Sequence, residues 1–135
     1  MSTDEAYLKH EKIGFPELSA EDQCRLLIRG DVKILNNLTP GYRMRFIPTG
    51  LFQKYITISR ETFKSLFESS GYIEQLNEAH RDHPKRDGEW VEPFGDGRFE
   101  LKVQERGSIV HGQSFPSFDA VVDYYVSMFY NKAIR

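Results

Sequence analysis

Two arginines two positions apart are the first residues in this sequence whose spacing points to chemistry. Arg43 and Arg45 alternate with Tyr42, Met44 and Phe46, and this period of two is typical of a strand with one apolar face. On such a strand both guanidinium groups emerge on the same side, where they repel unless an anion or a carboxylate lies between them. A planar guanidinium binds phosphate through two parallel hydrogen bonds. The spacing alone favours a solvated strand face paired with nearby acids, and a phosphate site is the alternative that it leaves open.

The other residues that could react form weaker patterns. Residues 80–82 (HRD) match the start of a kinase catalytic loop, but the downstream Asn, the glycine-rich loop and the Asp-Phe-Gly motif are missing. His80 and His83 are spaced like a pair of metal ligands, yet no cysteine lies near them. Cys24 falls on the expected buried side of a helix, which favours a core cysteine over a nucleophile. We therefore expect no enzyme activity, no metal and no cofactor.

The composition fits a single soluble domain. The chain has 135 residues, of which 39% are hydrophobic and 28% are charged. Its 18 Lys and Arg against 20 Asp and Glu give a formal net charge of −2, whereas a nucleic-acid binder usually has a basic excess. We find no apolar run long enough to span a membrane, no secretory signal and only one cysteine. The sequence thus predicts a cytoplasmic monomer without nucleic-acid or membrane partners.

Periodicity and capping residues predict the elements that must position the arginines. Ser19 is the expected N-cap of a helix that Gly30 ends, and Ser117 is the expected N-cap of an amphipathic C-terminal helix. The other expected elements are strands over 42–47, 52–59 and 98–103, a short strand from 108, and two short helices within 63–79. We expect residues 1–14 to be a charged lead-in and residues 84–97 to be an irregular loop.

This order predicts an α+β domain with a central antiparallel sheet flanked by two helices. A hairpin through residue 50 would join the strand that carries the arginines to the next central strand. Residues 60–97 would then be a helical insertion between the second and third central strands, inside a single domain of residues 15–135.

Four pieces of the chain resemble the Src homology 2 (SH2) domain family, including its divergent members in bacterial effectors. Residues 41–45 (GYRMR) are similar to the family's arginine strand, with Arg45 at the invariant arginine. The other pieces are residues 18–27, which look like the first helix, residues 55–59, which look like the next central strand, and residues 115–125 (FPSFDAVVDYY), which look like the second helix. The last motif is the most specific, and residues 60–97 remain unmatched.

The resemblance implies a phosphotyrosine-binding slot. The residues that it assigns to the slot are Arg45 at the floor, Arg43, Thr49 and Lys102 beside the phosphate, and Tyr55 on the wall. Arg43 would partly replace an arginine that many members carry where this chain has Ala20. The expected partners are tyrosine-phosphorylated proteins or peptides, because phosphoserine is too short to reach the floor of such a slot.

Departures from the family pattern leave alternatives open. Phe46 and Ile47 replace the acid and the serine that usually follow the floor arginine, so one hydroxyl donor is missing. The main alternative is a phosphate-independent interaction scaffold of the same fold that acts through residues 60–97. A third hypothesis is a small enzyme with its site in residues 80–97. A secreted bacterial effector would act in the host cytosol.

Overall fold

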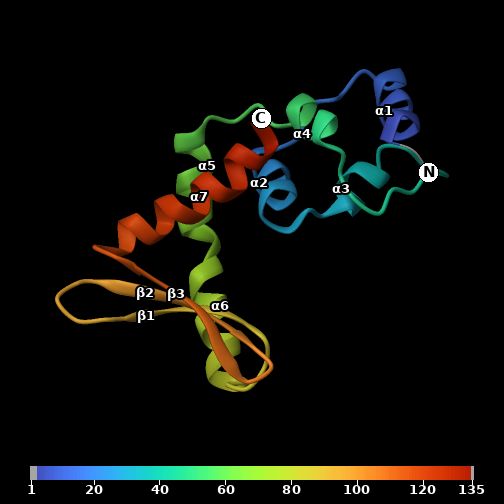
Figure 1. Cartoon of the computed structure of the whole chain (residues 1–135). Coiled ribbons are helices and arrows are strands. Elements are labelled where there is room, and N and C mark those ends of the chain that lie inside the picture. The colour runs from blue at the N-terminus through green and yellow to red at the C-terminus, as the bar shows by residue number, and fades with distance from the viewer. Residues whose placement is uncertain (1–2, 135) are drawn as a thin grey trace. The chain divides into compact units, whose positions relative to one another are not determined.

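The computed structural model describes residues 3–134, with side chains described for residues 8–131 (Figure 1). Six helices come first in this part of the chain: α1 (Thr3–Lys12), α2 (Ala20–Arg29), α3 (Val32–Asn36), α4 (Thr49–Tyr55), α5 (Arg60–Ser70) and α6 (Tyr72–Asp82). They are followed by β1 (Gly88–Pro93), β2 (Phe99–Glu105), β3 (Ser108–Phe115) and α7 (Phe118–Ile134). The strands form one antiparallel sheet in the order β1-β2-β3, with no helix between them.

The predicted architecture is wrong in its central feature. The sheet is made from residues 88–115 alone, and neither 42–47 nor 52–59 belongs to it. Residues 49–55 form α4, and β1 lies in the segment that was expected to be an irregular loop. Residues 60–97 are therefore no insertion between strands, because they supply α5, α6 and the first strand of the sheet.

The alternation around the arginines is real, but a sheet does not produce it. Tyr42 and Met44 are buried, while Arg43 and Arg45 are exposed. The backbone of this segment has no neighbouring strand, and the side chain of Asn36 pairs with it instead. A period of two in burial therefore arises here in a loop.

Residues expected to form the second central strand are helical because their apolar side chains also repeat at helical spacing. Leu51, Phe52, Tyr55 and Ile56 are all buried, which places one face of α4 in the core. The aromatic and β-branched residues near the end of this segment favour a strand, but burial of a helical face outweighs that preference.

The helices with clear capping signals are confirmed. Ser19 Oγ accepts a hydrogen bond from the backbone N–H of Asp22 at 3.1 Å, and Gly30 ends α2 with a left-handed φ of 59°. Ser117 Oγ accepts from the backbone N–H of Ala120 at 3.1 Å in the first turn of α7. The two short helices expected within 63–79 are also present, as α5 and α6.

The chain divides into two compact units. The first unit holds the residues up to Leu66 and those from Val126 onward, and the second holds Phe67–Tyr125.

One buried side chain ties α2 to the segment after α4 in the first unit. Gln23 is 2% exposed, and its amide group donates to the carbonyl of Leu18 and to the hydroxyl of Thr57, both at 3.0 Å. Its oxygen accepts from the backbone N–H groups of Thr57 and Ile58 at 2.8 and 3.0 Å. Every donor and acceptor position of the Gln23 amide is therefore used, and the hydrogen bond to Thr57 joins residues 34 positions apart in the sequence.

The N-terminal segment is a helix with a residue in the core. His10, in the last turn of α1, is fully buried, and its Nδ1 lies 3.0 Å from the hydroxyl of Tyr55. Its Nε2 is buried without a hydrogen-bond partner among the described residues. Burial lowers the pKa of His10 below its ordinary value of 6.5 and raises the pKa of Tyr55 to about 12.

We expect the protein to lose stability as the pH falls below about 6.5. Because the pKa of His10 is lower in the folded state, the unfolded chain binds more protons in this range, and acid favours unfolding. Above this range the ring is neutral in both states, and its contribution is complete. One such group changes the free energy of unfolding by at most about 1.4 kcal/mol per pH unit.

The measurement is urea unfolding at about pH 7.5 and about pH 5.5 for the protein and for His10→Gln. The variant should lose less stability between the two pH values. An equal loss would assign the acid sensitivity to other groups.

In the second unit, the first turns of α7 cover one face of the sheet. Phe99 of β2 packs edge-on against Phe118, and Phe115 of β3 packs against Tyr124, with ring centroids 5.4 Å apart in both pairs. The hydroxyl of Tyr125 donates to a carboxylate oxygen of Glu89 on β1. These contacts place the apolar core of the unit between the sheet and this helix.

The two edges of the sheet differ in their protection. At β1, the side-chain oxygen of Asn77 on α6 accepts a hydrogen bond from the backbone N–H of Val91 at 2.8 Å. The imidazole ring of His80 stacks on the indole of Trp90, with ring centroids 3.6 Å apart. At β3, seven of the eight residues are exposed and none is charged. Within the described part of the chain, β3 forms hydrogen bonds only with β2. The β3 edge is therefore open.

Candidate functional site

The two arginines lie on a loop of residues 42–48 in the first unit, which we name the arginine loop. Asn36, the last residue of α3, fixes its backbone through Met44. The Asn36 side-chain oxygen accepts from the N–H of Met44 at 3.0 Å, and its Nδ2 donates to the carbonyl of Met44 at 3.2 Å. The last residue of the loop, Pro48, is buried and directly precedes α4. The loop is thus held in place on both sides of Arg45.

The arginine loop presents two cations and an aromatic ring to solvent. Arg43 and Arg45 are exposed, and Phe46 is 62% exposed although the strand hypothesis placed its ring in the core. Among the described side chains, neither guanidinium has an acidic partner. The simpler expectation, in which nearby acids neutralise the pair, is therefore not met in this part of the chain.

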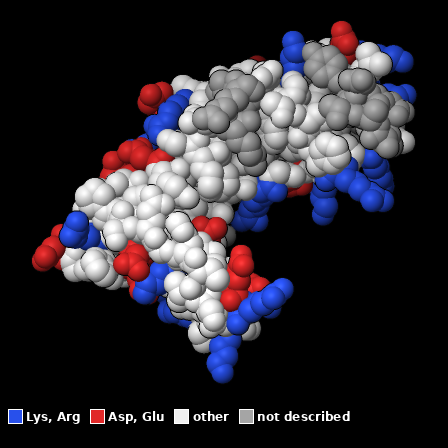
Figure 2. All heavy atoms as spheres, viewed as in Figure 1, with Lys and Arg blue, Asp and Glu red and all other residues white. Residues whose placement is uncertain are grey.

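The loop lies in a stretch of sequence without acidic residues. Residues 32–60 contain five Lys and Arg and no Asp or Glu. The first unit as a whole carries 12 Lys and Arg against 8 Asp and Glu, while the second carries 6 against 12. Figure 2 shows blue side chains gathered along the side of the molecule where α2 and α3 lie. The net charge of −2 hides this asymmetry, which gives an anion a favourable potential near the loop.

The other residues of the first unit that the resemblance assigned to the slot separate in the structure. Thr49 is exposed and is the first residue of α4, directly after the arginine loop. Tyr55, at the far end of the same helix, is 1% exposed and contacts His10. Thr49 therefore remains a candidate to donate its hydroxyl, whereas Tyr55 belongs to the core.

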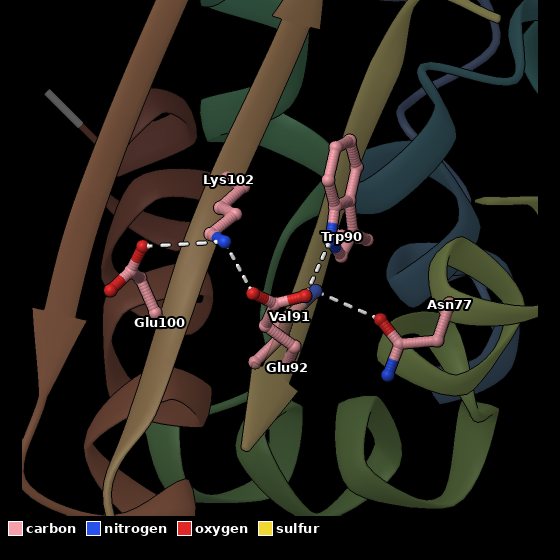
Figure 3. Close-up of polar contacts among 6 residues, drawn as sticks. All are labelled: Asn77, Trp90, Val91, Glu92, Glu100 and Lys102. Atoms are coloured by element: carbon pink, nitrogen blue, oxygen red, sulfur yellow. Dashed lines mark hydrogen bonds and ion pairs between the residues drawn. The ribbon is translucent and has the colours of Figure 1, made fainter. Parts of the chain in front are cut away.

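Lys102 lies on β2 in the second unit, between two glutamates (Figure 3). Its Nζ lies 2.5 Å from Glu92 and 3.8 Å from Glu100, and the indole N–H of Trp90 donates to Glu92 at 3.2 Å. The hydrogen bond from Lys102 lowers the pKa of Glu92, and the same bond raises the pKa of Lys102. Lys102 is thus neutralised locally, and it belongs to a different unit from Arg45.

The remaining reactive candidates have structural surroundings. Cys24 is buried in α2, and desolvation, with the charge of Glu21, raises the pKa of its thiol to about 11, the opposite of an activated nucleophile. Within the described residues, no group of three or more His, Cys, Asp or Glu is placed to hold a metal ion. None of the described helices is long and apolar enough to cross a membrane.

The second unit contains a pocket that was not predicted from the sequence, and we name it the acidic pocket. It measures about 280 Å³ and lies where the turn between α5 and α6 meets the start of α7. Its apolar lining consists of Phe67, Tyr72, Ile73, Phe118 and Val122. Serines and a glycine at 69–71 marked the turn in the sequence, but no local signal showed which helix would pack against it.

A comparison with family models, curated proteins and solved structures finds no match for this chain. The resemblance to the SH2 family therefore stays a hypothesis from the sequence.

Proposed function

We propose that the chain is a non-enzymatic module that binds tyrosine-phosphorylated peptides at the arginine loop. The observation that carries this proposal is the pairing of both Met44 backbone groups with Asn36, which fixes the backbone between two exposed arginines. A phosphotyrosine carries close to two negative charges and three acceptor oxygens, which suit two guanidinium groups. A loop that is fixed before binding loses less conformational entropy when the ligand arrives.

The exposed ring of Phe46 supports a ligand whose phosphate is attached to an aromatic ring. Phe46 follows Arg45 directly, so a tyrosine ring that stacks on it can carry its phosphate to the arginines. A phosphoserine brings the phosphate without the ring. We therefore expect the affinity to decrease from phosphotyrosine to phosphoserine to unphosphorylated peptides.

Fluorescence polarisation with a degenerate phosphotyrosine peptide pool tests the proposal. The same pool is run with phosphoserine and with unmodified tyrosine at the fixed position. Binding that requires the phosphate and favours the aromatic ester supports the proposal. Equal binding of the phosphorylated and unphosphorylated pools overturns it.

A matched variant tests whether Lys102 takes part in phosphopeptide binding. We expect Lys102→Ala to change the affinity for the phosphotyrosine pool by less than about twofold, because two glutamates already neutralise this lysine. The polarisation assay on the variant gives the answer directly. A loss of about tenfold or more would place Lys102 in the binding site, as the resemblance implied.

The alternative, a phosphate-independent scaffold that acts through residues 60–97, needs a test other than deletion. These residues form α5, α6 and β1, so their removal would destroy the second unit. The acidic pocket supports the alternative, because Phe67, Tyr72 and Ile73 in this segment line it. Substitutions at the pocket therefore replace the deletion as its test.

A further inference from the structure

The open edge of the sheet has a regular part and an irregular part. Residues 111–115 of β3 pair one to one with β2, and Val110 is the extra residue of a bulge next to the pair of Val103 with His111. In an antiparallel edge strand, every second residue directs its N–H and C=O away from the sheet. Within the described residues, these outward groups of β3 have no partner. Residues 111–115 therefore offer a regular row of hydrogen-bonding groups to another strand.

A row of charges crosses one face of the sheet and ends beside this edge (Figure 3). Nζ of Lys102 lies 2.5 Å from Glu92 on β1 and 3.8 Å from Glu100 on β2. Glu92 also accepts from the indole N–H of Trp90 at 3.2 Å. Within the described part of the chain, the long contact to Lys102 is the only ion pair or hydrogen bond of the Glu100 carboxylate. One ammonium group thus serves two carboxylates, and Glu100 is the less satisfied of the two.

Gly112 leaves the Glu100 carboxylate uncovered on the side of the edge. A Cβ atom at Gly112 would meet Oε1 of Glu100 at 3.6 Å, so this oxygen lies directly beside the backbone of β3. The side chain of Glu100 is 20% exposed, which shows that solvent reaches it. Because glycine has no side chain, a long side chain on a strand added at this edge can reach the carboxylate across β3.

The charges around the edge favour a basic occupant. Glu92, Lys102 and Glu100 alternate in sign, and a cation on an added strand would continue the alternation beyond Gly112. The second unit carries 6 Lys and Arg against 12 Asp and Glu, so its potential attracts a positive segment. A second copy that paired its own β3 here would bring no cation, because β3 is uncharged, and it would bring two acidic units together.

We infer that β3 binds an extended segment of a partner protein as a fourth strand, with a Lys or Arg beside Gly112 that pairs with Glu100. The backbone hydrogen bonds supply affinity, and the cation sets the register and the preference for a basic sequence. The bulge at Val110 limits regular pairing to residues 111–115. The site uses no residue of the arginine loop and does not depend on the proposed function.

Two peptide pools test the inference on the whole chain. Both are fluorescein-labelled, strand-forming pools of Thr, Val and Ser, with a fixed central arginine in one and a fixed central glutamate in the other. In fluorescence polarisation, the arginine pool should bind at least about tenfold more tightly than the glutamate pool. Amide hydrogen exchange in β3 should slow when the arginine pool is bound, because the outward N–H groups gain partners.

Glu100→Gln removes the charge and keeps the size of the side chain. Lys102 retains its contact with Glu92, so the sheet should stay folded, and the preference for the arginine pool should fall below about threefold. Glu100→Lys should reverse the preference in favour of the glutamate pool. Glu105→Gln is the matched control, because Glu105 is an exposed carboxylate of β2 that pairs with Ser108 beyond the bulge. It should keep the full preference.

Four results would overturn the inference: no binding of the arginine pool, equal affinity for the two pools, a preference that survives Glu100→Gln, or binding that leaves the exchange of β3 unchanged. Protection of β3 that grows with protein concentration in the absence of peptide would assign the edge to a second copy instead. Because neither pool carries a phosphate, these results leave the proposed function untouched.

Discussion

Exchange of both arginines, as Arg43→Gln with Arg45→Gln, should lower the affinity for phosphotyrosine peptides at least about 100-fold. Each hydrogen-bonded contact to a charged group contributes about 1.5–3 kcal/mol, and about 1.4 kcal/mol corresponds to a factor of ten. The two arginines are exposed and have no acidic partner in the described chain, so the exchange should leave the fold intact. The loss would therefore measure binding rather than stability.

Arg98→Gln is the matched control for this double exchange. Arg98 is exposed and lies in the second unit, so its removal lowers the positive charge without touching the loop. Polarisation gives the affinities, and thermal unfolding shows whether each variant is folded. Arg45→Lys alone should also weaken binding, because an ammonium group cannot form the bidentate contact. A loss below about threefold for the double variant would remove the arginine loop from the site.

Gln23→Leu should lower the free energy of unfolding by about 3 kcal/mol. The exchange removes four hydrogen bonds and leaves the backbone N–H groups of Thr57 and Ile58 without their acceptor. A buried polar group without a partner costs about 1–3 kcal/mol. Thr57 is exposed to solvent, so we expect a total smaller than the sum over both N–H groups. Leucine is close to glutamine in size, so the exchange leaves little cavity at this position.

Urea unfolding measures this loss, with Gln53→Leu on α4 as the control. Gln53 is exposed, and its exchange should change the free energy of unfolding by less than about 0.5 kcal/mol. A loss below about 1 kcal/mol for Gln23→Leu would mean that water replaces the amide contacts.

Local signals in the sequence predicted local structure. Ser19, Gly30 and Ser117 act on backbone groups within a few residues, and the helices that they bound are present. The interaction of Gln23 with Thr57 spans 34 residues, and nothing in the sequence around either residue indicates it. The same holds for β1, because its glycines, prolines and charges resemble a loop until β2 pairs with it.

The burial pattern around the two arginines could be predicted from the sequence, but the framework that holds them could not. The sequence correctly indicated that Arg43 and Arg45 are exposed while Tyr42 and Met44 are buried. It could not show that Asn36, eight residues earlier, supplies the hydrogen bonds that a neighbouring strand would have supplied. The assignments of Tyr55 and Lys102 depended on a sheet that the chain does not form. Tyr55 is buried in the core, and Lys102 is paired with two glutamates.

The open edge of β3 has a consequence for the handling of the protein. Ile109 and Val110 are each more than half exposed, and no charge or proline within Ser108–Phe115 discourages another strand from pairing there. Partial unfolding of the second unit would add fresh apolar surface beside this edge and create a template for irreversible aggregation. The shelf life of concentrated solutions should then follow the rate at which this unit opens, not the free energy of unfolding of the whole chain.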